Sequence, residues 1–121
     1  MQAPIRNIEF SRDLVIAKVA SVWGAAAVTD VMRALDAYLG DDSPEGRARV
    51  QLAVLKVVGD EQAKIPDLVA AAQRDFRDVV AWAEYPEELR SPTWRLPAAE
   101  QARIRTADRA QYLAWLAAHG A

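Results

Sequence analysis

The run "VQLAVLKVV", residues 50–58, is apolar on almost every side and constrains the fold more than any other part of the chain. Ser43 and Pro44 precede it in the pattern of a helix N-cap followed by proline at the first helical position, and Gly59 follows it as a helix stop. The β-branched residues would also suit a buried strand, but a sheet needs partners and only one such run exists. We therefore predict a helix, with residues 47–58 at the centre of the protein.

Two short segments have the composition of connectors: "GDDSPEG" at residues 40–46 and "YPEELRSPTWRLP" at residues 85–97. Elsewhere the apolar residues recur at helical spacing. The chain of 121 residues is therefore predicted to be all-α, a single domain over residues 1–121 that forms an irregular bundle of four to five helices. The last helix, residues 97–118, could be semi-independent of the rest.

Residues 12–39 carry apolar side chains on nearly opposite helical faces before and after "GAAA", residues 24–27. One long helix passing between two neighbours would give this pattern. A break at Gly24, with Thr29 as the N-cap of a second helix, would give it as well. We expect the long helix and keep the broken one as the alternative.

Residues 66–84 predict a third helix, with Pro66 in its first turn. Trp82 lies just outside the apolar stripe of this helix, on the same flank as Asp75 and Asp78. The stripe itself contains Leu68, Val69, Ala72, Phe76, Val79, Val80 and Ala83. A tryptophan in that position needs a cover from elsewhere.

The absence of cysteine excludes disulfides, thiolate metal sites and cysteine nucleophiles, and it fits a reducing cytoplasm. The first ten residues lack the apolar run of a signal peptide. The segment "LVIAKVASVWGAAAV", residues 14–28, is too short to span a bilayer and is interrupted by Lys18. We expect a soluble, cytoplasmic protein without a membrane partner.

The formal net charge of −2 argues against nucleic-acid binding, which needs a clustered basic surface. Residues 41–90 carry 7 basic and 11 acidic groups, whereas residues 91–121 carry 4 basic and 2 acidic groups. The C-terminal segment is therefore expected to lie against the acidic middle, in the same subunit or in a neighbour. The basic stretch at residues 90–105 resembles a nucleic-acid-binding segment with Trp94 for stacking, but a solvated helix start is the preferred interpretation.

No residue pattern predicts a catalytic site. The sole histidine, His119, lies two residues from the C-terminus, where side chains are seldom held in place. Phosphate-binding loops and nucleophile elbows are missing from the sequence. We predict no cofactor, and the balance favours a non-catalytic protein over an enzyme.

The acidic residues suggest an alternative hypothesis about the function. A helical bundle can bring carboxylates from several helices around a hard cation. Asp75, Asp78 and Glu84 could line such a pocket between helix 66–84 and the connector that follows it. The chain would then be a small hydrolase or a ligand-binding domain, with or without a divalent metal.

The leading hypothesis about the function rests on the positions of the tryptophans. The chain has 4 of them, three in or after the third predicted helix and near two tyrosines. Exposed aromatic patches usually mark an interface. The connector could fold back with Pro86 and Trp94 over Trp82, or another subunit could cover it. We predict a non-catalytic helical protein that self-associates, as a homodimer, or binds a protein partner through an aromatic surface, whose residues are Trp82, Tyr85, Trp94, Tyr112 and Trp115.

One long stretch resembles known proteins. It is "RVQLAVLKVVGDEQAKIPDLVAAAQRDFRDVVAWAEYPEEL", residues 49–89, and its most distinctive motifs are "QLAVLK", "RDFRDV" and "AEYPEE". This stretch is similar to one found in small bacterial all-helical proteins of no assigned function. The resemblance implies a bacterial, soluble, helical protein and brings no activity, cofactor or catalytic residue with it.

Overall fold

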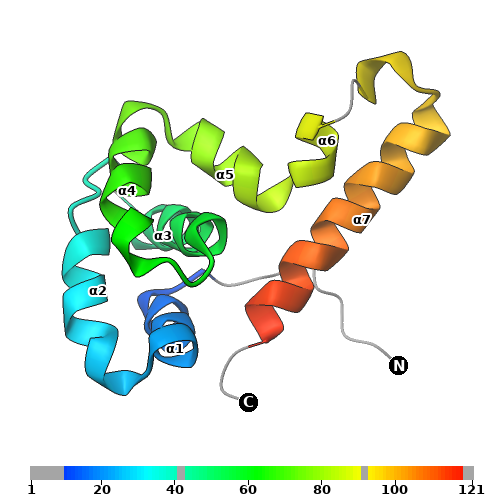
Figure 1. The fold of residues 1–121 in the computed structure, drawn as a ribbon. Coiled ribbons are helices and arrows are strands. Elements are labelled where there is room, and N and C mark those ends of the chain that lie inside the picture. Colours follow the sequence, from blue (N-terminus) through cyan, green and yellow to red (C-terminus); the bar gives the residue numbers. More distant parts are fainter. Residues whose placement is uncertain (1–9, 41–42, 91–92, 119–121) are drawn as a thin grey trace.

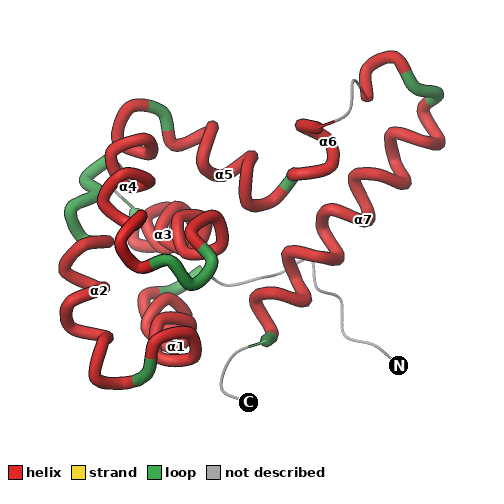
Figure 2. Tube along the Cα trace, viewed as in Figure 1, coloured by secondary structure: helices red, strands yellow, loops and turns green. Residues whose placement is uncertain are grey.

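The computed structural model describes residues 10–40, 43–90 and 93–118, and in these ranges the chain forms helices, turns and loops without a strand (Figure 2). The α-helices are α1 (Arg12–Trp23), α2 (Val28–Leu35), α3 (Pro44–Val58), α4 (Ile65–Arg74), α5 (Phe76–Glu84), α6 (Pro86–Arg90) and α7 (Ala98–Ala117). Three short 3₁₀ turns accompany them: η1 (Ala25–Ala27), η2 (Gln62–Lys64) and η3 (Thr93–Arg95). The all-α prediction is confirmed. The expected count of four to five helices is wrong, because two helices that were predicted to be continuous are broken and the second connector contains α6.

Helix α3 lies at the centre of the molecule and packs against α1, α4 and α5 (Figure 1). Its start and end are those that the sequence predicts. The Ser43 hydroxyl accepts a hydrogen bond from the Gly46 amide at 2.9 Å, and Pro44 follows as the first helical residue. Gly59 ends the helix at a φ of 64°, a left-handed value that favours glycine. Eight of the fifteen residues of α3 are buried, which makes this helix the main contributor to the core.

The break between α1 and α2 occurs at Gly24, so the expected long helix over residues 12–39 is wrong. Gly24 adopts φ 92° and ψ 161°, a region open almost only to glycine, and its amide still bonds to the Ala20 carbonyl at 2.8 Å. The turn folds α2 back so that its buried face meets the same core as that of α1. In a continuous helix, one of these two apolar faces would have pointed away from the core. Thr29 lies inside α2 and does not cap it.

Replacing Gly24 by alanine is expected to lower the free energy of unfolding by about 1.5 kcal/mol, as measured by urea denaturation. A Cβ atom there meets no heavy atom within 4 Å, so the effect comes from the backbone conformation alone. The matched control is Ala25→Ser, an exposed neighbour, which should change stability by less than about 0.5 kcal/mol. Equal stability of both variants would mean that the chain does not turn at Gly24.

The predicted helix 66–84 is also broken, and Asp75 is the reason. This residue is extended, at φ −158° and ψ 101°, and its carboxylate accepts a hydrogen bond from the Arg77 amide at 3.0 Å. Aspartate is among the best N-cap residues, so α5 starts anew after it. The break rotates α5 relative to α4 and leaves Phe76, which was expected in the core, 43% exposed. The other members of the expected stripe are buried or half-buried.

Helix α7 is the longest helix and extends beyond the body formed by α1 to α5 (Figure 1). It packs on α6, η3 and α5. Its only fully buried side chains are Asp108, Tyr112 and Leu116, all in its second half. They recur every four residues and therefore form one narrow stripe. No helix of the described ranges, α7 included, is long and apolar enough to cross a membrane.

Candidate functional site

The structure divides the five aromatic residues that the sequence predicts as an interface. Trp82 on α5 is 45% exposed, and Trp94 in η3 is 73% exposed. Tyr85, after the end of α5, and Trp115 on α7 are half-buried. Tyr112 is buried and stacks on Trp115, with the ring centroids 5.8 Å apart. Two of the five side chains therefore offer a large surface to solvent, and Tyr112 belongs to the core.

Lys18 on α1 covers Trp115 from within the chain. Its side chain is buried, and its ammonium nitrogen lies 4.3 Å from the centroid of the Trp115 ring. The same nitrogen donates to the Trp115 carbonyl and, at 3.5 Å, to the Ala118 carbonyl. Burial lowers the pKa of Lys18. A cation at the C-terminal end of a helix is favourably placed in the helix dipole, so Lys18 attaches the end of α7 to α1.

Three large apolar side chains on successive elements remain exposed. Besides Trp82 on α5 and Trp94 in η3, Leu89 on α6, which lies between them in the sequence, is 54% exposed. We call these three residues the exposed apolar surface. The segments that carry them follow one another along the upper edge of the molecule in Figure 1. Cover of Trp82 by Pro86 and Trp94 of the connector was one of the two expected alternatives, but Trp82 is still 45% exposed and Trp94 is 73% exposed, so the connector does not bury this ring.

The basic stretch at residues 90–105 is engaged in contacts within the chain. Its four arginines each have a neighbour: Arg90 pairs with Glu87, Arg103 with Glu100 and Arg105 with Glu88, while Arg95 lies over the Trp94 ring. The Arg105 pair joins α7 to α6 over 3.2 Å. This contact places part of the basic C-terminal segment against the acidic middle of the same chain, which is one of the two expected arrangements.

The three carboxylates of the alternative pocket do not converge. Asp75 precedes α5 and Glu84 ends it, and a rise of about 1.5 Å per residue separates their backbones by roughly 13 Å. Asp75 is occupied by the Arg77 guanidinium, whose hydrogen bond lowers the pKa of that carboxyl group. Asp78 is exposed. Within the described residues, no group of three histidine or acidic side chains is placed to hold a metal ion.

Glu84 lines a cavity without its two predicted partners. Two adjoining cavities of about 180 and 220 Å³ lie between the end of α5 and α7, and both are lined by Glu84, Tyr85, Arg109 and Tyr112. The Glu84 carboxylate is buried and accepts two hydrogen bonds from the Arg49 guanidinium of α3, at 2.9 and 2.8 Å. A bidentate pair of this kind uses both carboxylate oxygens. Glu84 therefore holds α5 to α3 and is not available as a general base.

The Tyr112 hydroxyl beside this ion pair is buried and makes no hydrogen bond to the described part of the chain. Burial raises the pKa of Tyr112 above its usual range, and the negative charge of Glu84 raises it further. The hydroxyl therefore stays protonated at neutral pH. It can donate a hydrogen bond, but it cannot act as a base.

Asp108 is a structural residue that the sequence did not single out. It is fully buried on α7, and its two carboxylate oxygens accept hydrogen bonds from the Glu87 and Glu88 amides, each at 3.0 Å. These amides belong to the first turn of α6, so a side chain from another helix serves as the N-cap of α6. The cap comes from 20 residues away, and no local pattern predicts it. It fixes α6, with Leu89, against α7.

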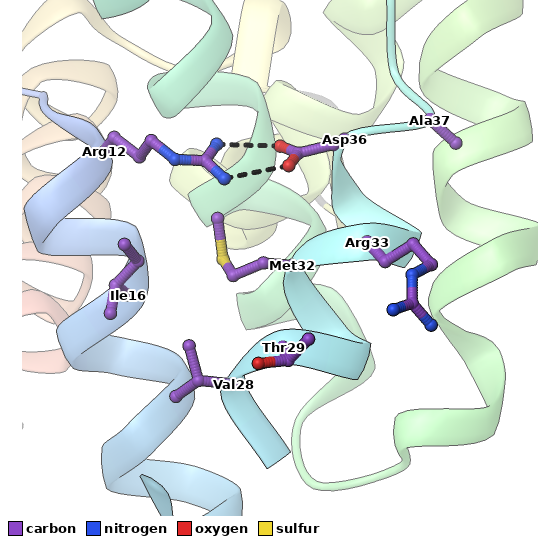
Figure 3. A pocket seen from close by; sticks show the side chains of 8 residues that line it. All are labelled: Arg12, Ile16, Val28, Thr29, Met32, Arg33, Asp36 and Ala37. Carbon is purple, nitrogen blue, oxygen red and sulfur yellow. Dashed lines mark hydrogen bonds and ion pairs between the residues drawn. The ribbon is translucent and has the colours of Figure 1, made fainter. Parts of the chain in front are cut away.

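An open hollow lies between α1 and α2 (Figure 3). It is an open groove of about 580 Å³ with Ile16, Val28 and Met32 along its apolar wall. Figure 3 shows the Arg12 guanidinium facing the Asp36 carboxylate at one end, through two hydrogen bonds of 2.8 Å. This hydrogen bonding lowers the pKa of Asp36. Because each charge neutralises the other, the groove contains no pair of groups arranged for acid–base catalysis.

The described residues form an all-α protein in which four of the six exposed large apolar side chains lie after residue 75. Compared with known proteins, the chain matches no family model, no curated protein and no solved structure. The resemblance of residues 49–89 to small bacterial proteins stays a prediction.

Proposed function

We propose that this chain is a non-catalytic helical protein that self-associates, or binds a protein partner, through the exposed apolar surface. The observation that carries the proposal is the exposure of Trp82 and Trp94, together with Leu89, on three successive elements. Contiguous exposed apolar patches mark interaction sites, and we infer that these three side chains belong to one such patch. Tryptophan and arginine are also the residues that most often dominate binding free energy, and Arg95 lies over Trp94.

The packing of α7 supports the same proposal. None of the residues in its first half is buried, although this half is helical and carries the half-buried Ile104. Isolated helices need a packed face for most of their stability. A partner that covers the exposed apolar surface next to η3 would also shield the start of α7. The chain would gain burial there that it lacks as a single copy.

The state of the buried acidic groups supports a non-catalytic role. Glu84 is neutralised by Arg49, and Asp108 is consumed in capping α6. A catalytic acid or base must exchange its proton with a substrate, which neither group can do while these bonds hold. Ligand binding in the cavities beside Glu84 is the less favoured alternative, because Arg49 already uses both oxygens of this carboxylate.

Trp82→Asp is expected to convert the associated protein into a monomer, with half the dimer mass in size-exclusion chromatography with light scattering over a hundredfold dilution. The substitution puts a charge into a surface that has to become dry, and such groups are costly to bury without a partner. Helicity, measured by circular dichroism, should stay unchanged, because Trp82 lies outside the buried residues of α5.

The matched control is Leu39→Asp. Leu39 is 78% exposed, follows α2, and is held through its amide by Gln73 of α4, away from the exposed apolar surface. This variant should keep the parent mass. A parent protein that is monomeric at every concentration without a partner, or a folded Trp82→Asp variant with the parent mass, would contradict self-association through this surface.

A further inference from the structure

Most charged side chains of α5, α6 and α7 find an oppositely charged neighbour in the chain. The pairs are Asp75–Arg77, Glu84–Arg49, Glu87–Arg90, Glu88–Arg105 and Glu100–Arg103. Asp78 on α5 and Arg95 in η3 are different, because neither has a salt bridge in the described part of the chain. Both side chains are exposed. Asp78 interacts electrostatically with Arg77, which already pairs with Asp75, and Arg95 lies over the Trp94 ring, so neither charge has an ion-pair partner of its own in the described part of the chain.

Each of these two charges lies beside one of the exposed tryptophans. Asp78 and Trp82 are four residues apart on α5, so they are neighbours on one helical face. The Arg95 guanidinium lies 4.5 Å from the centroid of the Trp94 ring. The chain thus presents two small patches, an acidic one at Trp82 and a basic one at Trp94. Each combines an aromatic ring with a charge that the other lacks.

We propose that the occupant of the exposed apolar surface is a second copy of this chain, docked so that Arg95 and Trp94 of one copy contact Asp78 and Trp82 of the other. The inference rests on the self-association proposed above and adds the partner and the pairing. Complementary charges at an interface fix the register of the two surfaces and exclude wrong partners. A second copy is the one partner that is certain to offer the complement of both patches.

Two-fold symmetry makes this pairing self-consistent. In a symmetric dimer, if one patch of the first copy contacts the other patch of the second, the reverse contact forms as well. The Asp78–Arg95 ion pair is then made twice, once in each direction, and no charged patch is left open for a third copy. The position of α5 and η3 along the same edge of the molecule is compatible with a single shared interface (Figure 1).

A charge exchange tests the pairing. Asp78→Arg and Arg95→Asp are each expected to raise the dimer dissociation constant by about tenfold, because two attractions become two repulsions. The double variant Asp78→Arg/Arg95→Asp should return to within about threefold of the parent value, since it restores both attractions with the signs exchanged. Sedimentation or light scattering over a dilution series measures these constants, and circular dichroism checks that each variant is folded.

The matched control replaces Asp67 of α4 instead of Asp78. Asp67 is also an exposed acid in the first turn of a helix, so Asp67→Arg/Arg95→Asp changes the same kinds of charge without the proposed contact. It should stay as weak as Arg95→Asp alone. Rescue by both double variants, or by neither, overturns the pairing. If Trp82→Asp still gives monomers in that case, self-association itself stands, whereas a parent that never dimerises overturns both proposals.

Discussion

Leu52→Ala is expected to lower the free energy of unfolding by about 3 kcal/mol, the largest effect of a single truncation that we predict. Leu52 is fully buried on α3, which is in contact with α1, α4 and α5. Truncation loses the burial of three carbon atoms and leaves a cavity that surrounding helices cannot fill without moving. Chemical denaturation followed by circular dichroism measures the change.

Val57→Ala is the control for this prediction, because it removes apolar atoms from the same helix at a site that is 37% exposed. It should cost less than about 1 kcal/mol. A helix at the edge of the molecule would give similar, small values for both variants. Such a result would contradict the central position of α3 and the assignment of its buried residues to the core.

Asp108→Ala is expected to cost about 2 kcal/mol in the same measurement. The carboxylate makes two charge-assisted hydrogen bonds to the amides of Glu87 and Glu88, and these lose their partner when it is removed. Because Asp108 joins α6 to α7, the loss should also loosen Leu89 and weaken association through the exposed apolar surface. Hydrogen exchange at the two amides measures the local effect directly.

Two further variants distinguish the loss of the α6 N-cap from the loss of a negative charge as the cause of the lower stability. Asp108→Asn keeps one acceptor oxygen in place and should cost less than Asp108→Ala. Asp67→Ala removes an exposed carboxylate from the first turn of α4 and should cost at most about 0.5 kcal/mol. If Asp108→Ala is as mild as Asp67→Ala, α6 does not depend on α7 for its start.

Helix ends that are set by local chemistry were predictable from the sequence. Ser43, Pro44 and Gly59 act on the backbone next to them, and the bounds of α3 agree with that pattern. The break at Asp75 had a local signal too, because aspartate favours the N-cap, but the apolar periodicity across it suggested continuity. The break at Gly24 was the less favoured of two alternatives, since periodicity cannot say whether two opposite faces have two neighbours or one.

The candidate site was predictable only in part. The position of Trp82 beside the apolar stripe indicated that its ring would need a cover, and this ring is 45% exposed. The partial cover of Trp115 had no such signal, because its partner Lys18 is 97 residues earlier in the chain. The separation of Asp75 from Glu84 could have been read from the sequence, because nine residues of a continuous helix would also place their backbones roughly 13 Å apart.

The sequence by itself determined that the chain is helical, that α3 is its most buried helix and where α3 begins and ends. These properties depend on residues within one or two turns of each other, where spacing and capping act directly. Only the tertiary structure decided which charged side chains form ion pairs or hydrogen bonds within the chain. The Arg49–Glu84 pair and the Asp108 cap join residues 35 and about 20 positions apart. That Asp78 and Arg95 lack a salt bridge can be recognised only after these long-range partners are known. The reason is that the partners of a charged side chain include residues distant in the sequence.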